Sequence, residues 1–128
     1  MKLDAFTAFC ESLPHATYVR QWGDSHVWKI GGKVFAIAGD EKGEITGVSF
    51  KVTPIAFHIL KDQPGCRGAP YMASRGMKWI QRFSDETMSD DELLTYLRDS
   101  YRLVGAGLTK KIQRELGLSP ESPRGFPS

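Results

Sequence analysis

Apolar side chains near the start of the chain recur every three or four positions, which is the spacing of one helix face. The residues concerned are Leu3, Phe6, Phe9, Cys10 and Leu13. Pro14 ends the run, because proline lacks a backbone donor and clashes with a preceding helical turn. The pattern predicts an amphipathic helix over residues 3–13.

Alternating apolar and polar positions then predict a series of strands. The runs cover residues 17–22, 26–30, 33–38 and 45–52. Gly31-Gly32 separates the second and third runs, and two residues that can take positive φ between strands favour a tight hairpin. In the fourth run, one face carries Val48, Phe50 and Val52, and the other carries Ile45, Gly47, Ser49 and Lys51. An antiparallel meander is the simplest arrangement.

The second half of the chain begins with Thr53-Pro54, an N-cap residue followed by proline, which predicts a short helix. Residues 63–70 are dense in glycine and proline and are expected to form a loop. Residues 78–83 are then expected to return to the sheet as a strand.

A capping box, Ser89 with Glu92, predicts the start of a long third helix. One face of that helix carries Leu93, Leu94, Leu97, Tyr101, Val104 and Leu108. A short helix is expected over 109–116. Residues 117–128 are rich in proline and serine and lack periodicity, so they are expected to be a disordered tail.

These elements together predict an α+β fold, with an antiparallel sheet of about four to five strands and helices packed on one face. The chain has 128 residues, which suits one domain, placed at residues 1–116. The composition, 41% hydrophobic and 25% charged, is that of an ordinary globular protein. No apolar run approaches the roughly 20 residues of a membrane span, and no export signal is visible, so a cytoplasmic protein without membrane contact is expected.

The sequence offers little support for catalysis. The three histidines, at positions 15, 26 and 58, have no metal-ligand spacing to one another or to Cys10 and Cys66. No nucleophile elbow or phosphate-binding glycine loop occurs. Cys66 lies beside Arg67, which can activate a thiol, but no base accompanies it. We therefore expect a protein that is not an enzyme and needs no cofactor and no metal.

Positive charge is uneven along the chain, although the net charge is only +2. Four cations, Arg67, Arg75, Lys78 and Arg82, lie in a stretch without acidic residues. From Tyr71 to Trp79, cations alternate with large flat side chains, a mixture that suits phosphates and unstacked bases. The alternative is that Tyr71 and Trp79 belong to the core and that the cations are ordinary surface charges.

The order of several short motifs resembles the MmcQ/YjbR family. They are Lys33-Val34-Phe35-Ala36, Val48-Ser49-Phe50-Lys51 with Pro54, Pro64-Gly65, Ala69-Pro70-Tyr71-Met72, Lys78-Trp79-Ile80, Asp91-Glu92-Leu93-Leu94 and Ser100-Tyr101-Arg102-Leu103-Val104. The resemblance implies a CyaY-like fold and a proposed role as a double-wing DNA-binding protein, without catalytic residues. It points to Lys33 and Lys51 as functional, and to Trp79, Ser100 and Tyr101 as structural or stacking residues.

The leading hypothesis is a monomeric module that binds DNA or RNA by its phosphates. The candidate contacts are Lys33, Lys51, Arg75, Lys78, Lys110 and Lys111. Iron, which the CyaY relation suggests, is rejected because the first helix offers only Asp4 and Glu11 as oxygen ligands. Two alternatives stay open: a protein-interaction module, and a small-molecule or anion-binding domain. The latter needs a pocket lined by Trp22, Trp28 or Trp79.

Overall fold

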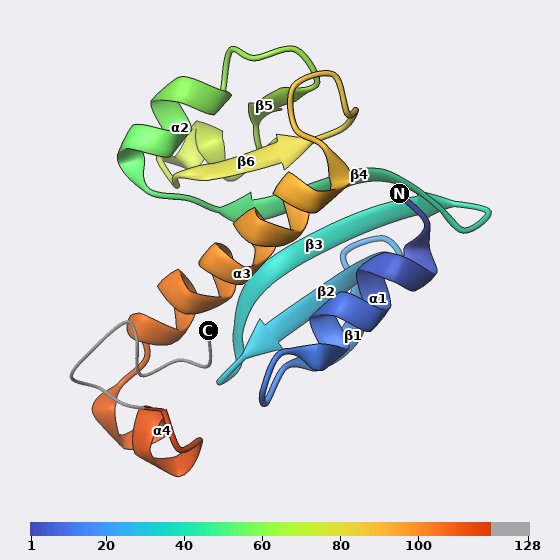
Figure 1. The fold of residues 1–128 in the computed structure, drawn as a ribbon. Coiled ribbons are helices and arrows are strands. Elements are labelled where there is room, and N and C mark those ends of the chain that lie inside the picture. The colour runs from blue at the N-terminus through green and yellow to red at the C-terminus, as the bar shows by residue number, and fades with distance from the viewer. Residues whose placement is uncertain (119–128) are drawn as a thin grey trace.

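The computed structural model describes residues 1–118, in which one antiparallel sheet of six strands forms the centre of the molecule (Figure 1). The order across the sheet is β1-β2-β3-β4-β6-β5. The strands are β1 (Thr17–Gln21), β2 (Ser25–Ile30), β3 (Lys33–Glu41), β4 (Glu44–Lys51), β5 (Cys66–Gly68) and β6 (Trp79–Arg82). The expected α+β class is confirmed, but the strand count of four to five was too low. The additional strand, β5, lies in the segment expected to be a loop.

Two helices, α1 (Leu3–Ser12) and α3 (Asp90–Ala106), cover the same face of the sheet (Figure 1). The shorter helices are α2 (Pro54–Leu60), α4 (Lys110–Glu115) and the 3₁₀ turn η1 (Ala73–Arg75). The predicted caps are present. Thr53 accepts a hydrogen bond from the Ala56 amide, and Ser89 and Glu92 form the reciprocal capping box of α3.

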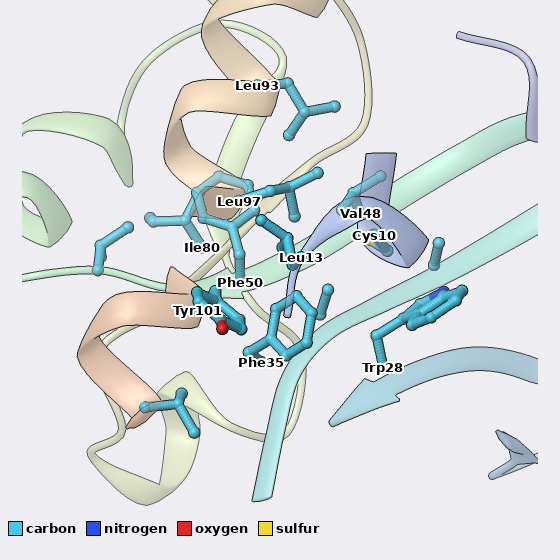
Figure 2. Close-up of a cluster of buried hydrophobic side chains, with 14 of the residues drawn as sticks. Cys10, Leu13, Trp28, Phe35, Val48, Phe50, Ile80, Leu93, Leu97 and Tyr101 are labelled. Atoms are coloured by element: carbon cyan, nitrogen blue, oxygen red, sulfur yellow. The ribbon is translucent and has the colours of Figure 1, made fainter. Parts of the chain in front are cut away.

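The core lies between this helical layer and the sheet (Figure 2). Helix α1 supplies Phe6 and Cys10, and α3 supplies residues that include Leu97 and Tyr101. Phe35 of β3 meets the Tyr101 ring edge-on, with ring centroids 5.5 Å apart. Non-polar burial of this kind is the main stabilising contribution in a domain of this size.

Ser100 of α3 lies at the point where β3 and β4 separate. The last regular pair there is Ala36 with Phe50. One residue further, the Ser100 hydroxyl donates to the Phe35 carbonyl at 2.6 Å and accepts from the Lys51 amide at 2.9 Å. The side chain thus satisfies two backbone groups that the sheet leaves without a strand partner.

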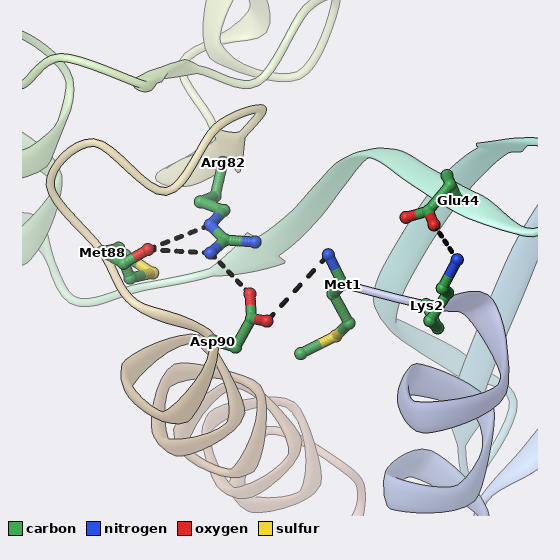
Figure 3. A network of polar contacts seen from close by, with 6 residues as sticks. All are labelled: Met1, Lys2, Glu44, Arg82, Met88 and Asp90. Atoms are coloured by element: carbon green, nitrogen blue, oxygen red, sulfur yellow. Dashed lines mark hydrogen bonds and ion pairs between the residues drawn. The ribbon is translucent and has the colours of Figure 1, made fainter.

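Arg82 connects β6 to the start of α3 on the core side of the sheet (Figure 3). Its guanidinium is buried, donates twice to the Met88 carbonyl at 2.9 and 3.1 Å, and pairs with Asp90 at 2.8 Å. The Met1 amino group lies 4.0 Å from the same carboxylate. Figure 3 also shows the neighbouring pair of Lys2 with Glu44.

The β2–β3 hairpin packs against the part of the chain that runs from the end of α3 into α4. A side chain at Gly31, in the hairpin between β2 and β3, would place its Cβ 2.6 Å from a Leu108 methyl group, so glycine permits the close approach. Leu118 is buried in the core. The rest of the expected tail, residues 119–128, lies outside the described residues. Within residues 1–118, no helix is long and apolar enough to cross a membrane.

Candidate functional site

The sheet has an outer face, which is turned away from α1 and α3. Side chains alternate along each strand, so residues paired directly across the sheet share a face. One row of paired residues crosses all six strands on the outer face: Val19, Val27, Ile37, Ser49, Gln81 and Arg67. The neighbouring row contains Gly39 opposite Gly47. Small residues on the central strands therefore lower the middle of this face.

Two adjoining hollows occupy the outer face and share Ser25, Ile37, Ser49 and Gln81. The larger hollow, of about 560 Å³, is mostly apolar and extends to Trp22 and Tyr71. The smaller one, of about 370 Å³, is more polar and extends to Arg67 and Thr46. Volumes of about 300–1,000 Å³ are usual for ligand sites. The small-molecule hypothesis required a concave pocket lined by Trp22, Trp28 or Trp79. Trp22 lines the larger hollow.

Trp22 and Tyr71 reach the larger hollow from opposite edges of the sheet. Trp22 follows β1, and Tyr71 follows β5. The two side chains are 58% and 70% exposed, and their φ angles are +52° and +71°. A left-handed backbone costs a bulky residue about 1–2 kcal/mol, and an exposed ring recovers little of this through burial. Such positions occur more often at functional sites than elsewhere.

Three cations between β5 and the end of β6 rest on aromatic rings. The Arg67 guanidinium lies 5.1 Å from the Phe83 centroid, and its Nε donates to Gln81 at 2.7 Å. Arg75 lies 5.3 Å from the Tyr71 centroid and donates to the Tyr71 hydroxyl at 3.0 Å. Lys78 lies 5.0 Å from the centroid of the Phe57 ring on α2. The rings hold the cations in place while leaving them charged.

None of these three cations forms an ion pair with a carboxylate in the part of the chain that the structure describes. Arg82, the fourth cation of the acid-free stretch, is different because it is buried and paired with Asp90. The sequence stretch therefore divides into three available cations and one structural arginine.

The structure does not gather all of the predicted contacts in one place. Lys33 is exposed at the start of β3, beside the hairpin that packs on α4, and Lys110 and Lys111 are exposed at the start of α4. Lys51 ends β4 and is half-buried, next to α2 and α3. Only Arg75 and Lys78 belong to the aromatic segment. The proposed roles of these lysines stay predictions.

The residues that the resemblance identified as structural or stacking are all buried. Trp79 is 4% exposed and pairs with Lys51 across β4 and β6, which places it on the outer face. Ser100 connects α3 to the sheet, as described above. The Tyr101 hydroxyl donates to the Pro14 carbonyl at 2.7 Å, and burial raises the pKa of this tyrosine.

Sequence reasoning named Trp22 and Arg67 separately but did not place them with Phe83 on one surface. The alternation of β4 did place Gly47 and Ser49 on a common face away from the core, and small residues there were an available signal. The pairing of Arg67 with Gln81 depended on β5, whose three residues lie in a segment dense in glycine and proline.

A hydrogen-bonded chain of Tyr18, His26 and Asp40 was also missed. The Tyr18 hydroxyl lies 2.8 Å from His26 Nδ1, and His26 Nε2 lies 2.7 Å from Asp40 Oδ1. The His26 hydrogen bond, together with one from the Gly43 amide at 3.0 Å, lowers the pKa of the Asp40 carboxyl. This chain joins β1, β2 and β3 on the helical side of the sheet, where Tyr18 and His26 line a groove beside α1.

Histidine, cysteine and acidic side chains form no group of three or more that could hold a metal ion among residues 1–118. Cys10 and Cys66 are free and buried, and burial raises the pKa of both thiols. The charge of Arg82 partly offsets this effect at Cys66. Both side chains are therefore neutral thiols near pH 7, which is unfavourable for nucleophilic chemistry.

Two solved protein structures have a fold similar to that of this chain. The chain is similar to the crystal structure of Deinococcus radiodurans protein DR2400, which has a DUF419 domain, with a TM-score of 0.78 and 25% identity over 99% of this chain and 96% of that one. A Pseudomonas syringae protein, structural genomics target PsR293, shares the fold with a TM-score of 0.63 and 18% identity, over 81% of this chain and 99% of that one. No curated protein matches. The YjbR family model matches residues 11–103, and because this is well over half of the sequence, the chain belongs to the YjbR family.

Proposed function

We propose that this protein is a small, non-enzymatic, cytoplasmic module that binds DNA in single-stranded form on its outer face. The observation that carries the proposal is a set of three cations that have no carboxylate partner within residues 1–118. Arg67 lies on the Phe83 ring, Arg75 on the Tyr71 ring and Lys78 on the Phe57 ring of α2. Cations supply contacts to phosphates, and exposed rings supply platforms for unstacked bases.

A single strand fits this surface better than a duplex does. Bases inside a duplex stack on one another and present only their edges, whereas a single strand can place its bases on protein rings. Tyr71 and Phe83 are exposed and already adjoin guanidinium groups. Base and phosphate contacts would therefore alternate along the segment from β5 to β6.

Fluorescence anisotropy of a labelled oligonucleotide, single-stranded and as a duplex, at several salt concentrations tests the proposal. We expect the single strand to bind more tightly and its affinity to fall with salt, because bound cations displace counterions. Replacing Arg67→Glu and Arg75→Glu together should reduce the slope of log K against log salt by about 1.4, at about 0.7 for each lost phosphate contact.

The matched control is Arg98→Glu with Arg114→Glu, which makes the same change in net charge at exposed positions of α3 and α4. This variant should retain the wild-type slope. An equal loss in both variants would mean that overall charge, and not the outer face, governs binding. Absence of binding at low salt would overturn the proposal.

A second candidate, a protein-interaction module, is favoured by one observation on α2. Ile55 and Ile59, one helical turn apart, are 75% and 59% exposed. Replacing both with serine should abolish a protein contact and leave oligonucleotide binding unchanged. Affinity purification from nuclease-treated lysate, with wild type and this variant compared, would show whether the patch captures a partner.

A further inference from the structure

The paired hollows of the outer face have an unusual combination of surfaces. One end is apolar and carries two exposed aromatic rings, and the other is polar and contains a guanidinium group. The strands between them contribute only small or neutral side chains, among them Gly39, Gly47 and Ser49. Among the described residues, Arg67 is the one charged residue that lines the hollows, whereas Arg75 adjoins the apolar end through its contact with the Tyr71 ring.

We infer that the paired hollows bind one planar aromatic ring with an attached anionic group, the ring beside Trp22 and Tyr71 and the anion at Arg67. A nucleotide has this chemistry, whether it is free or part of a strand. The inference deepens the proposed function and rests on it for the strand as the source.

At the polar end of the hollows, contacts within the protein already fix the Arg67 guanidinium in the absence of ligand. Gln81 accepts from Arg67 Nε at 2.7 Å, and the Phe83 ring lies beneath the guanidinium, so the group is held at two points. The remaining guanidinium donors form no hydrogen bond within residues 1–118. Ser25, Thr46 and Ser49 line the same hollow, and the Ser25 hydroxyl already donates to the Trp22 carbonyl at 3.2 Å. A fixed guanidinium beside hydroxyl donors is well suited to a phosphate or carboxylate.

The apolar end of the hollows is lined by Trp22 and Tyr71, two aromatic residues with positive φ. Folding gains little from Trp22 or Tyr71, because each is mostly exposed and each has a positive φ that glycine would adopt without cost. Both nevertheless line the larger hollow from opposite edges of the sheet. A flat ligand in this hollow would cover ring surface that the free protein leaves exposed, which supplies stabilisation that the free protein lacks.

The test uses intrinsic tryptophan fluorescence and two probes, adenosine 5′-monophosphate and adenosine. Trp22 is the exposed tryptophan, since Trp28 and Trp79 are 3% and 4% exposed. We expect saturable quenching by the monophosphate, with adenosine at least tenfold weaker. Arg67→Met should remove the difference between the two probes, because only the anionic group contacts Arg67.

Two further variants address the apolar end of the hollows. Trp22→Gly combined with Tyr71→Gly removes the fluorescent reporter, so isothermal titration calorimetry measures its affinity for the monophosphate. That affinity should fall at least tenfold, although the substitutions relieve backbone strain. Lys42→Gly is the matched control, because Lys42 also has a positive φ, +51°, but lies in the turn between β3 and β4 and not in the hollow. Ser49→Leu should reduce binding by filling the floor shared by both hollows. Melting temperatures establish that each variant is folded.

The outcomes separate this inference from the proposed function. Competition between the monophosphate and a single strand for wild type, lost in Ser49→Leu, supports both. Salt-dependent strand binding that Ser49→Leu and the double glycine variant retain overturns the inference and leaves the proposed function standing. Monophosphate binding without strand binding supports the ligand class and overturns the proposed function. Failure of both probes and of the strand overturns both.

Discussion

Single side chains decide how this sheet and its helices hold together, and Ser100 is the clearest case. Its hydroxyl takes the place of a strand partner for the Phe35 carbonyl and the Lys51 amide. Sequence alone indicated that position 100 lies on a helix, but serine there has no periodic signal. Its role depends on where two strands diverge, which no local pattern encodes.

Ser100→Ala should lower the free energy of unfolding by about 3 kcal/mol, because two buried backbone groups lose their partner at about 1–3 kcal/mol each. Urea unfolding followed by circular dichroism measures the change. The control is Thr95→Ala, which deletes an exposed hydroxyl on the same helix and should cost less than about 0.5 kcal/mol. Equal effects of the two substitutions would refute this role for Ser100.

At the scale of elements, sequence patterns predicted those whose signals are local. The capping box of α3, the cap of α2 and the hairpin at Gly31 were all visible, because each requires only a few adjacent residues. β5 was missed because its three residues become a strand only by pairing with β6. The hollow was missed for the same reason: its parts come from separate strands and meet only through register.

The junction of β6 with α3 depends on one arginine, and its partners can be separated by mutation. Arg82→Ala should destabilise the protein by about 3 kcal/mol, because the Met88 carbonyl loses both of its hydrogen bonds from the guanidinium and Asp90 loses its partner at 2.8 Å, which leaves the Met1 amino group 4.0 Å away. Asp90→Asn should cost less, about 1 kcal/mol, since this carboxylate is half exposed.

Asp91→Asn is the control for Asp90→Asn, because it removes the same charge from the same helical turn. It should cost about 0.3–0.5 kcal/mol, the lower part of the usual range for one charge near a helix start, because Asp91 is exposed. Thermal unfolding of the three variants gives the comparison. If Asp90→Asn and Asp91→Asn lower the stability equally, the ion pair of Asp90 with Arg82 contributes nothing measurable.

The molecule as a whole carries carboxylates whose pKa values folding lowers. The pKa of Asp40 falls through its hydrogen bond from His26, that of Glu44 through its bond from Lys2, and that of Glu92 through the Ser89 amide. A carboxyl with a lowered pKa in the folded state stabilises the protein above its unfolded-state pKa, near 4, and loses this contribution as the pH falls.

We therefore expect the melting temperature to fall as the pH is lowered from about 5 towards 3, the range just above and below the unfolded-state pKa values. Differential scanning calorimetry over this range measures the fall. Asp40→Asn should be less stable than wild type at pH 7, and the gap should narrow at low pH. A gap independent of pH would show that the Asp40 charge does not contribute.

The position of Ser100 also has a consequence for the order of folding. The Ser100 hydroxyl bonds to Phe35, 65 positions earlier in the chain, and to Lys51, 49 positions earlier. Strands β2, β3 and β4, in contrast, are connected by tight turns. Contacts between distant positions form late, because closing a long loop costs chain entropy. In stopped-flow experiments Ser100→Ala should therefore accelerate unfolding, by about a hundredfold for 3 kcal/mol, and leave the refolding rate nearly unchanged. The meander would then form the folding nucleus, and α3 would dock on it after the rate-limiting step.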